Sequence, residues 1–303
     1  YSKNGNSSAT STVELSDGQS VTTTGGTEAF QILTFDSASN ITSISFEPAS
    51  VGFLLYEVRL NGKILIDSDI TPTTVPSINS VVKANPEAGF SVISYTGNGT
   101  AGATVAHGLN AKPDLLIVKN RDRAANWTVY HSSVGATKYI PLNLTNAATA
   151  WTGFLNDTEP TSSVITLGNG SGPNHNGEDI IIYAMSAVAG YSAFGSYTGN
   201  GSSDGPFVYT GHKVAFIMIK RSNSGSAWVI VDNKRDGYNE TYKWLEPNTN
   251  NAEQSVTPVA NVDFLSNGFK LRGNGATTNA SGGEYIYWAV AENPFSANGG
   301  LAR

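Results

Sequence analysis

The chain reads Phe90-Ser91-Val92-Ile93-Ser94-Tyr95-Thr96-Gly97-Asn98-Gly99, and a related run returns as Phe194-Gly195-Ser196-Tyr197-Thr198-Gly199-Asn200-Gly201, with its tyrosine 102 residues after the first. Apolar residues alternate with small polar ones, a pattern typical of a half-buried strand. Gly-Asn-Gly then supplies residues that adopt positive φ easily, as a hairpin turn requires. Each run therefore predicts a strand followed by a tight turn.

Further matches follow in the same order along the chain. Leu115–Arg121 recurs as Phe216–Arg221, with its lysine 101 residues later, and Trp127–Val129 recurs as Trp228–Ile230, also 101 residues later. Ordered matches at a nearly constant offset indicate a tandem duplication. We predict an all-β fold of antiparallel β-sandwich modules, jelly-roll or lectin-like, present in two copies. The expected strands are Phe90–Tyr95, Leu115–Lys119, Trp127–Tyr130, Val164–Leu167, Ile180–Ala184, Ala215–Lys220, Trp228–Val231, Phe269–Arg272 and Tyr285–Val290.

The domain organisation follows from this repeat. The predicted segments are an N-terminal β domain or remnant of a longer chain at 1–75, a linker at 76–88, the first sandwich repeat at 89–192 and the second at 193–303. Before the linker, Phe30–Phe35 and Ile41–Phe46 predict strands, and Asn61-Gly62 between two apolar runs predicts a hairpin. The chain begins at Tyr1 rather than Met, so we expect it to be processed or to be part of something longer.

Composition excludes several classes of function. Only 14% of the residues are charged and the net charge is −6, without a Lys/Arg-rich run. We therefore expect no nucleic-acid partner, since such binding requires a basic face. The sequence has no cysteine, which excludes disulfides and thiolate chemistry. No apolar stretch approaches the roughly 20 residues of a membrane helix, so we expect no membrane insertion.

Motifs for catalysis and cofactors are weak. Gly97–Gly102 matches G-x-G-x-x-G, but the sequence continues as an alternating strand rather than the helix that a dinucleotide site needs. The carboxylate pairs Asp157/Glu159 and Glu178/Asp179 leave a glycosidase open as an alternative. We predict no catalytic residues and no cofactor.

Metal binding has little support in the sequence. The four histidines, at positions 107, 131, 175 and 212, are scattered, and no two lie within five residues of each other. Asn200, Ser203 and Asp204 carry oxygen atoms suited to calcium, yet the same residue types are ordinary loop formers. We therefore predict no metal site.

Two tryptophans at equivalent positions suggest a binding surface. Exposed indole rings offer flat apolar area to the C–H face of a sugar, and neighbouring Asn or Arg side chains can bond its hydroxyl groups. The alternative is that both rings are core residues, as strand tryptophans in sandwiches often are. The candidate ligand-binding residues are Trp127, Tyr130, His131, Asn120, Arg121, Trp228 and Arg221.

The motif order also resembles a known but uncharacterised domain family of virion appendage proteins in marine bacteriophages, especially cyanophages. The resemblance rests on Gly89-Phe90-Ser91, Tyr95–Gly99, His107-Gly108-Leu109, Pro113-Asp114, Ile117–Arg121, Trp127–His131, Asp204–Val208, Phe264–Lys270 and Ala291–Phe295. The earlier stretch Glu57–Asp67 is similar to lectin-like modules found in the same proteins. No catalytic residues come with the resemblance.

The resemblance implies a non-enzymatic protein of the virion surface, outside the cell: a tail fibre, tail component or capsid decoration for host-surface attachment or particle assembly. The expected partners are further copies in a homo-oligomer, other virion proteins and host surface glycans. Three alternatives remain at this point: a purely structural cement or spacer protein, a polysaccharide-degrading glycosidase, and a cellular surface adhesin or filament subunit.

Overall fold

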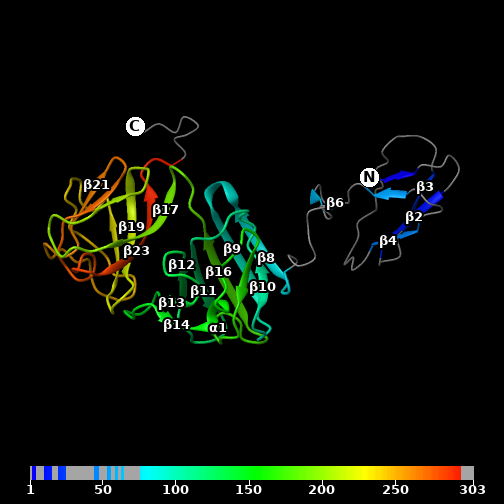
Figure 1. Cartoon of the computed structure of the whole chain (residues 1–303), viewed down its shortest axis with the longest axis horizontal. Coiled ribbons are helices and arrows are strands. Elements are labelled where there is room, and N and C mark those ends of the chain that lie inside the picture. The colour runs from blue at the N-terminus through cyan, green and yellow to red at the C-terminus, as the bar shows by residue number, and fades with distance from the viewer. Residues whose placement is uncertain are drawn as a thin grey trace. The chain divides into compact units, whose positions relative to one another are not determined.

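The computed structural model describes residues 76–294 continuously, together with short strands nearer the N-terminus (Figure 1). The chain divides into two units, Tyr1–Thr74 and Val75–Arg303. It is an all-β structure with several antiparallel sheets, and its one short α-helix, among the described residues, is α1 (Thr152–Leu155). None of the helices in the described part is long and apolar enough to cross a membrane.

The described part of the first unit consists of short strands. These are β1 (Ser2–Asn4), β2 (Thr10–Leu15), β3 (Ser20–Thr24), β4 (Ile44–Glu47), β5 (Phe53–Leu55), β6 (Arg59–Leu60) and β7 (Lys63–Ile64). β3, β2 and β4 form one sheet, β1 pairs with β5, and β6 pairs with β7. The β6–β7 pair flanks Asn61-Gly62, where the sequence predicts a hairpin. The strand predicted at Phe30–Phe35 lies outside the described residues.

The first half of the second unit, residues 76–191, contains a seven-stranded antiparallel sheet. Its order is β14-β13-β12-β11-β16-β9-β8. The strands are β8 (Ser80–Asn85), β9 (Phe90–Thr96), β11 (Leu115–Asn120), β12 (Thr128–His131), β13 (Lys138–Pro141), β14 (Thr149–Ala150) and β16 (Asp179–Met185). A separate pair, β10 (Ala103–Ala106) and β15 (Val164–Leu167), packs against one face of this sheet: Leu116 and Val118 of β11 share an apolar cluster with Val105 and Ile165.

The second half, residues 192–294, also contains two antiparallel sheets. A four-stranded sheet has the order β17-β23-β19-β20, and a three-stranded sheet has the order β18-β22-β21. The strands are β17 (Ser192–Thr198), β18 (Phe207–Tyr209), β19 (Val214–Arg221), β20 (Trp228–Asp232), β21 (Val262–Leu265), β22 (Gly268–Leu271) and β23 (Glu284–Ala291). Ile217 and Ile219 of β19 meet Val208 and Phe269 in the cluster between the two sheets.

The two halves share a third apolar cluster. Leu115 and Val129 project from the opposite face of the seven-stranded sheet and pack with Met218 and Trp228 of the second half. Because side chains alternate along a strand, β11 and β19 each contribute one row to their own half and the other row to this shared cluster. The two large sheets are therefore buried on both faces where the halves meet.

The segment 76–88, predicted as a linker, is instead part of the first sheet. β8 pairs along β9 from Ser80↔Tyr95 to Asn85↔Phe90. The turn between them is built by its own residues: the Asn85 side chain accepts a hydrogen bond from the Ala88 N–H, and Gly89 has φ of 62°. Among the described residues the second half has no counterpart of β8, since only residues 186–191 separate β16 from β17.

One asparagine in each half makes the same set of hydrogen bonds. Asn174 Nδ2 donates to the carbonyl oxygens of Thr100 and Gly168, both at 2.9 Å, and its Oδ1 accepts from the Asn98 N–H at 2.9 Å. Asn279 Nδ2 donates to the carbonyls of Ser202 (2.8 Å) and Gly273 (2.9 Å), and its Oδ1 accepts from the Asn200 N–H at 2.9 Å. Both asparagines are fully buried. The Gly-Asn-Gly segments are thus bonded to the loop before the last strand of each half; they do not form the predicted hairpins, since β10 pairs with β15 and β18 with β22.

Candidate functional site

The predicted binding tryptophans differ in their surroundings. Trp228 is 2% exposed, lies in the cluster between the halves and donates from Nε1 to the Pro141 carbonyl at 3.0 Å. Its ring cannot meet a ligand because the first half covers it, so the prediction of a binding role for Trp228 is wrong. Trp127 is half-buried, immediately before β12.

Tyr130 and His131, also predicted to bind ligand, are core residues of β12. Tyr130 is fully buried and its hydroxyl donates to Glu159 Oε2 at 2.6 Å. His131 Nδ1 accepts from the Ser133 N–H at 3.1 Å, so Nε2 carries the proton and donates to the Tyr287 carbonyl at 3.0 Å. Burial lowers the pKa of His131 to about 4, which keeps the ring neutral. Both residues brace the protein rather than face solvent.

The remaining predicted residues have separate roles. Asn120 is fully buried, and its Oδ1 accepts from the backbone N–H groups of Asp122 and Arg123. Arg121 is exposed and pairs with Asp179 at 3.5 Å, while Arg221 Nε donates to Asn223 Oδ1 at 3.0 Å. With four of the seven candidates buried, they do not make one exposed surface.

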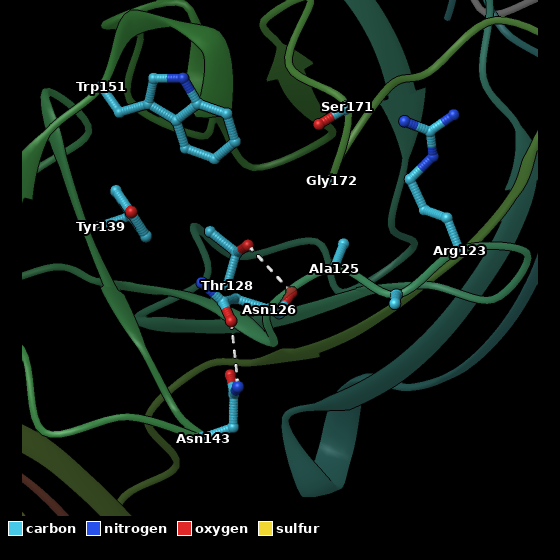
Figure 2. A pocket seen from close by; sticks show the side chains of 10 residues that line it. Arg123, Ala125, Asn126, Thr128, Tyr139, Asn143, Trp151, Ser171 and Gly172 are labelled. Carbon is cyan, nitrogen blue, oxygen red and sulfur yellow. Dashed lines mark hydrogen bonds between the residues drawn. The ribbon is translucent and has the colours of Figure 1, made fainter.

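A pocket of about 540 Å³ opens next to these residues in the first half. It is lined by Arg123, Ala124, Ala125, Asn126, Thr128, Tyr139, Asn143, Trp151, Ser171 and Gly172. Figure 2 shows the indole of Trp151 on one side and the guanidinium of Arg123 on the other. The lining therefore comes from the loop after β11, from β12, from β13 and the loop after it, from the residue that precedes α1, and from the loop held by Asn174.

The Trp151 ring is held by close packing. It stacks on Phe154 with an interplanar angle of 15°, and its ring centre lies 5.0 Å from that of Tyr139. Glycines allow this approach: a Cβ at Gly170 would lie 2.4 Å from the ring atom Cζ2, and a Cβ at Gly153 would lie 2.5 Å from Nε1. Trp151 and Tyr139 are both partly exposed. The pocket thus has a fixed aromatic wall.

Amide and hydroxyl groups form the polar side of the pocket. Asn143 Nδ2 donates to Asn126 Oδ1 at 3.0 Å, which is one of the dashed lines in Figure 2. Asn143 Oδ1 in turn accepts from the Trp127 N–H at 3.0 Å, so Trp127 supports this side through its backbone. The Ser171 side chain is exposed at the rim. These groups can both donate and accept hydrogen bonds.

Arg123 is the one charged residue among those that line the pocket. Its Nε donates to Glu178 Oε2 at 2.6 Å, and its Nη2 donates to Glu178 Oε1. Hydrogen bonding to Arg123 lowers the pKa of Glu178, which is therefore ionised at neutral pH. Asn120 Nδ2 adds a bond to the same carboxylate at 2.6 Å. The positive charge of Arg123 is therefore neutralised by Glu178 within the protein.

Sequence reasoning missed Trp151, Tyr139 and Arg123. The repeat drew attention to Trp127 and Trp228, whereas Trp151 is not repeated. The available signal was local: Trp151 stands two residues before Gly153, and Gly168-Asn169-Gly170 follows later in the same half. Small residues at both places are what a tightly packed indole requires, but only the fold brings them together. Among the described residues, no group of three or more His, Asp or Glu side chains is arranged to hold a metal ion.

Comparisons with known proteins give one match. Neither the curated proteins nor the solved structures contain a significant match to this chain. One family model matches residues 68–294, a range that includes β8, the pocket and both halves of the second unit. The chain belongs to the family described as a domain of unknown function, DUF7483.

Proposed function

We propose that this chain is a non-enzymatic surface protein of a bacteriophage particle, and that it attaches to host-surface glycans through the pocket beside Trp151. In this proposal it belongs to a tail fibre, the tail or the capsid decoration and acts outside the cell. The phage assignment derives from the motif resemblance. The glycan assignment derives from the pocket.

The observation that carries the glycan assignment is the combination of residues in that pocket. A partly exposed indole and phenol wall lies opposite amide, hydroxyl and guanidinium groups around a volume of about 540 Å³. Sugars present apolar C–H faces and hydroxyl edges, so they need this pairing of aromatic surface with hydrogen-bonding groups. None of the ten lining residues, all of them in the described part of the chain, is Asp or Glu. This favours binding over glycoside hydrolysis, which uses a pair of carboxylates.

We also propose that each half of the second unit is a β-sandwich and that the two arose by tandem duplication. The matching hydrogen bonds of Asn174 and Asn279 support this, as does the similar strand order in the two large sheets. A homo-oligomer on the particle would multiply a weak single site by avidity.

The attachment proposal is tested with the labelled full chain on cyanobacterial cells. Binding is expected to be saturable and to disappear after periodate treatment, which cleaves the vicinal diols of cell-surface glycans. Trp151→Ala is expected to weaken binding at least tenfold, since a stacking wall is lost. Tyr238→Ala is the matched control because Tyr238 is 88% exposed and lies in the other half. Binding that resists periodate, or that is equal in Trp151→Ala and wild type, contradicts the proposal.

A further inference from the structure

We propose that the pocket beside Trp151 selects neutral sugars over acidic ones. This inference rests on the proposed glycan-binding function and adds the ligand class. It concerns sugar units that differ only in carrying a hydroxymethyl group or a carboxylate, such as glucose and glucuronic acid.

Arg123 is already paired within the protein. An arginine is the usual partner of an acidic ligand, because its planar guanidinium binds carboxylates at two points. Here Glu178 already occupies that two-point position, through bonds from Nε and Nη2 to its two oxygens. Nη2 also lies 3.2 Å from His175 Nε2. An incoming carboxylate would have to displace Glu178, whose side chain is only 19% exposed.

The charged residues next to Arg123 in the chain are also paired. Arg121 pairs with Asp179 at 3.5 Å, so it too is balanced. The nearby Lys119 is directed at the backbone, since Nζ donates to the carbonyls of Ala125 (2.8 Å) and Arg123 (3.3 Å). Opposite charges paired within the protein leave little net field to attract an anion. The carboxylate of Asp122 is occupied as well, because it accepts from the Asp179 N–H at 2.6 Å.

The wall opposite Arg123 combines aromatic rings with uncharged polar groups. The faces of aromatic rings carry partial negative charge, which attracts polarised C–H groups and disfavours carboxylates. The Asn126–Asn143 pair and Ser171 offer both donors and acceptors. A hydroxyl group satisfies both kinds of partner, whereas an ionised carboxylate only accepts. The lining therefore matches a neutral polyhydroxylated unit.

The test compares matched oligosaccharides of glucose with those of glucuronic acid, and galactose with galacturonic acid, immobilised and probed with the full chain at about 150 mM salt. We expect at least tenfold stronger binding to a neutral member than to its acidic partner. Binding is expected to be nearly unchanged when the salt is raised to about 500 mM, because no ion pair to the ligand is involved. Trp151→Ala is expected to lose neutral binding, while Tyr238→Ala retains it.

Glu178→Gln sharpens the test, because it frees Arg123. This variant is expected to gain binding to the acidic member, and its melting temperature shows whether it folds. Equal or stronger binding of acidic sugars by the wild type overturns the selectivity but leaves glycan attachment standing. Failure to bind any sugar overturns the attachment function itself. If the Trp151→Ala variant still binds neutral sugars, the binding site lies elsewhere and its assignment to this pocket is wrong.

Discussion

The two halves of the second unit keep the same hydrogen-bonded frame but surround it differently. At Gly170, an added Cβ would meet the Trp151 ring, whereas at Gly275 it would meet Val259 Cγ1 at 2.7 Å. Tyr139 and Trp244 occupy equivalent positions in the two halves. Tyr139 precedes Ile140, which pairs with Val129, and Trp244 precedes Leu245, which pairs with Ile230. Tyr139 is partly exposed at the pocket, while Trp244 is 4% exposed.

The loop that borders the pocket shows the same contrast. In the first half the Ser171 carbonyl accepts from Asn120 Nδ2 at 2.9 Å, and in the second half the Ala276 carbonyl accepts from the hydroxyl of buried Tyr285 at 2.8 Å. The equivalent carbonyl oxygen thus accepts a hydrogen bond from an asparagine amide in one half and from a tyrosine hydroxyl in the other. The comparison teaches that a buried polar frame can stay constant while the side chains packed around it change.

The largest expected effect tests the two equivalent tryptophans. Trp228→Ala should lower the free energy of unfolding by about 4 kcal/mol, because it removes a buried ring from the cluster between the halves and leaves the Pro141 carbonyl without its partner. Trp127→Ala should cost less than about 1 kcal/mol, since that side chain is half-exposed. Denaturant unfolding of the full chain measures both. Equal losses would mean that the two positions are not differently buried.

The next effect tests the shared frame. Asn174→Ala and Asn279→Ala should each lower the free energy of unfolding by about 3 kcal/mol, because each leaves several buried backbone groups without a partner. Similar losses in the two variants support one frame used twice. A difference of more than about 2 kcal/mol, again from denaturant titrations, would show that the apparent match has no energetic counterpart.

The smallest expected effect concerns acid and the contact between the halves. His131 is neutral in the folded state because burial lowers its pKa to about 4, an effect that outweighs the opposite influence of the Asp114 carboxylate. An unfolded histidine titrates near 6.5, so the unfolded state binds the extra proton first and stability falls as the pH drops from about 6.5 to about 4. The contribution lost is about 3 kcal/mol at most.

His131→Gln should remove that part of the pH dependence, which is measured by unfolding titrations at pH values between 4 and 7. Asp232 occupies the equivalent position in the second half, so this sensitivity belongs to one half alone. An unchanged pH profile in the variant would show that other groups dominate the acid response.

Much of the strand pattern could be predicted from the sequence, because β9 alternates between apolar and polar residues, while β11, β16, β19 and β23 contain nearly continuous apolar runs. Those strands are central, and burial of their apolar rows leaves a clear signal. β8 was not predicted, since an edge strand with five of its six residues polar or exposed carries little pattern. The Gly-Asn-Gly segments do not form the predicted hairpin turns, since β10 pairs with β15 rather than β9 and β18 pairs with β22 rather than β17. The asparagines that hold these segments could not be predicted, because their bonds join residues that are 76 to 79 positions apart.

The candidate site could not be predicted in the same way. Trp228 was a candidate because a tryptophan recurs at equivalent positions of the two halves. Packing in an apolar core also favours such recurrence, and Trp228 lies in the cluster between the halves. The pocket depends instead on residues unique to the first half, Trp151 and Arg123, which only the three-dimensional structure places opposite each other (Figure 2).

The order of the strands has a consequence for synthesis. In each large sheet the strand made last lies in the middle: β16 is inserted between β9 and β11, and β23 between β17 and β19. Until that last strand is synthesised, the two strands that will flank it each have one unpaired edge. Unpaired strand edges promote aggregation. A nascent chain that ends before Glu284 lacks β23, so β17 and β19 of its second half cannot be joined into one sheet.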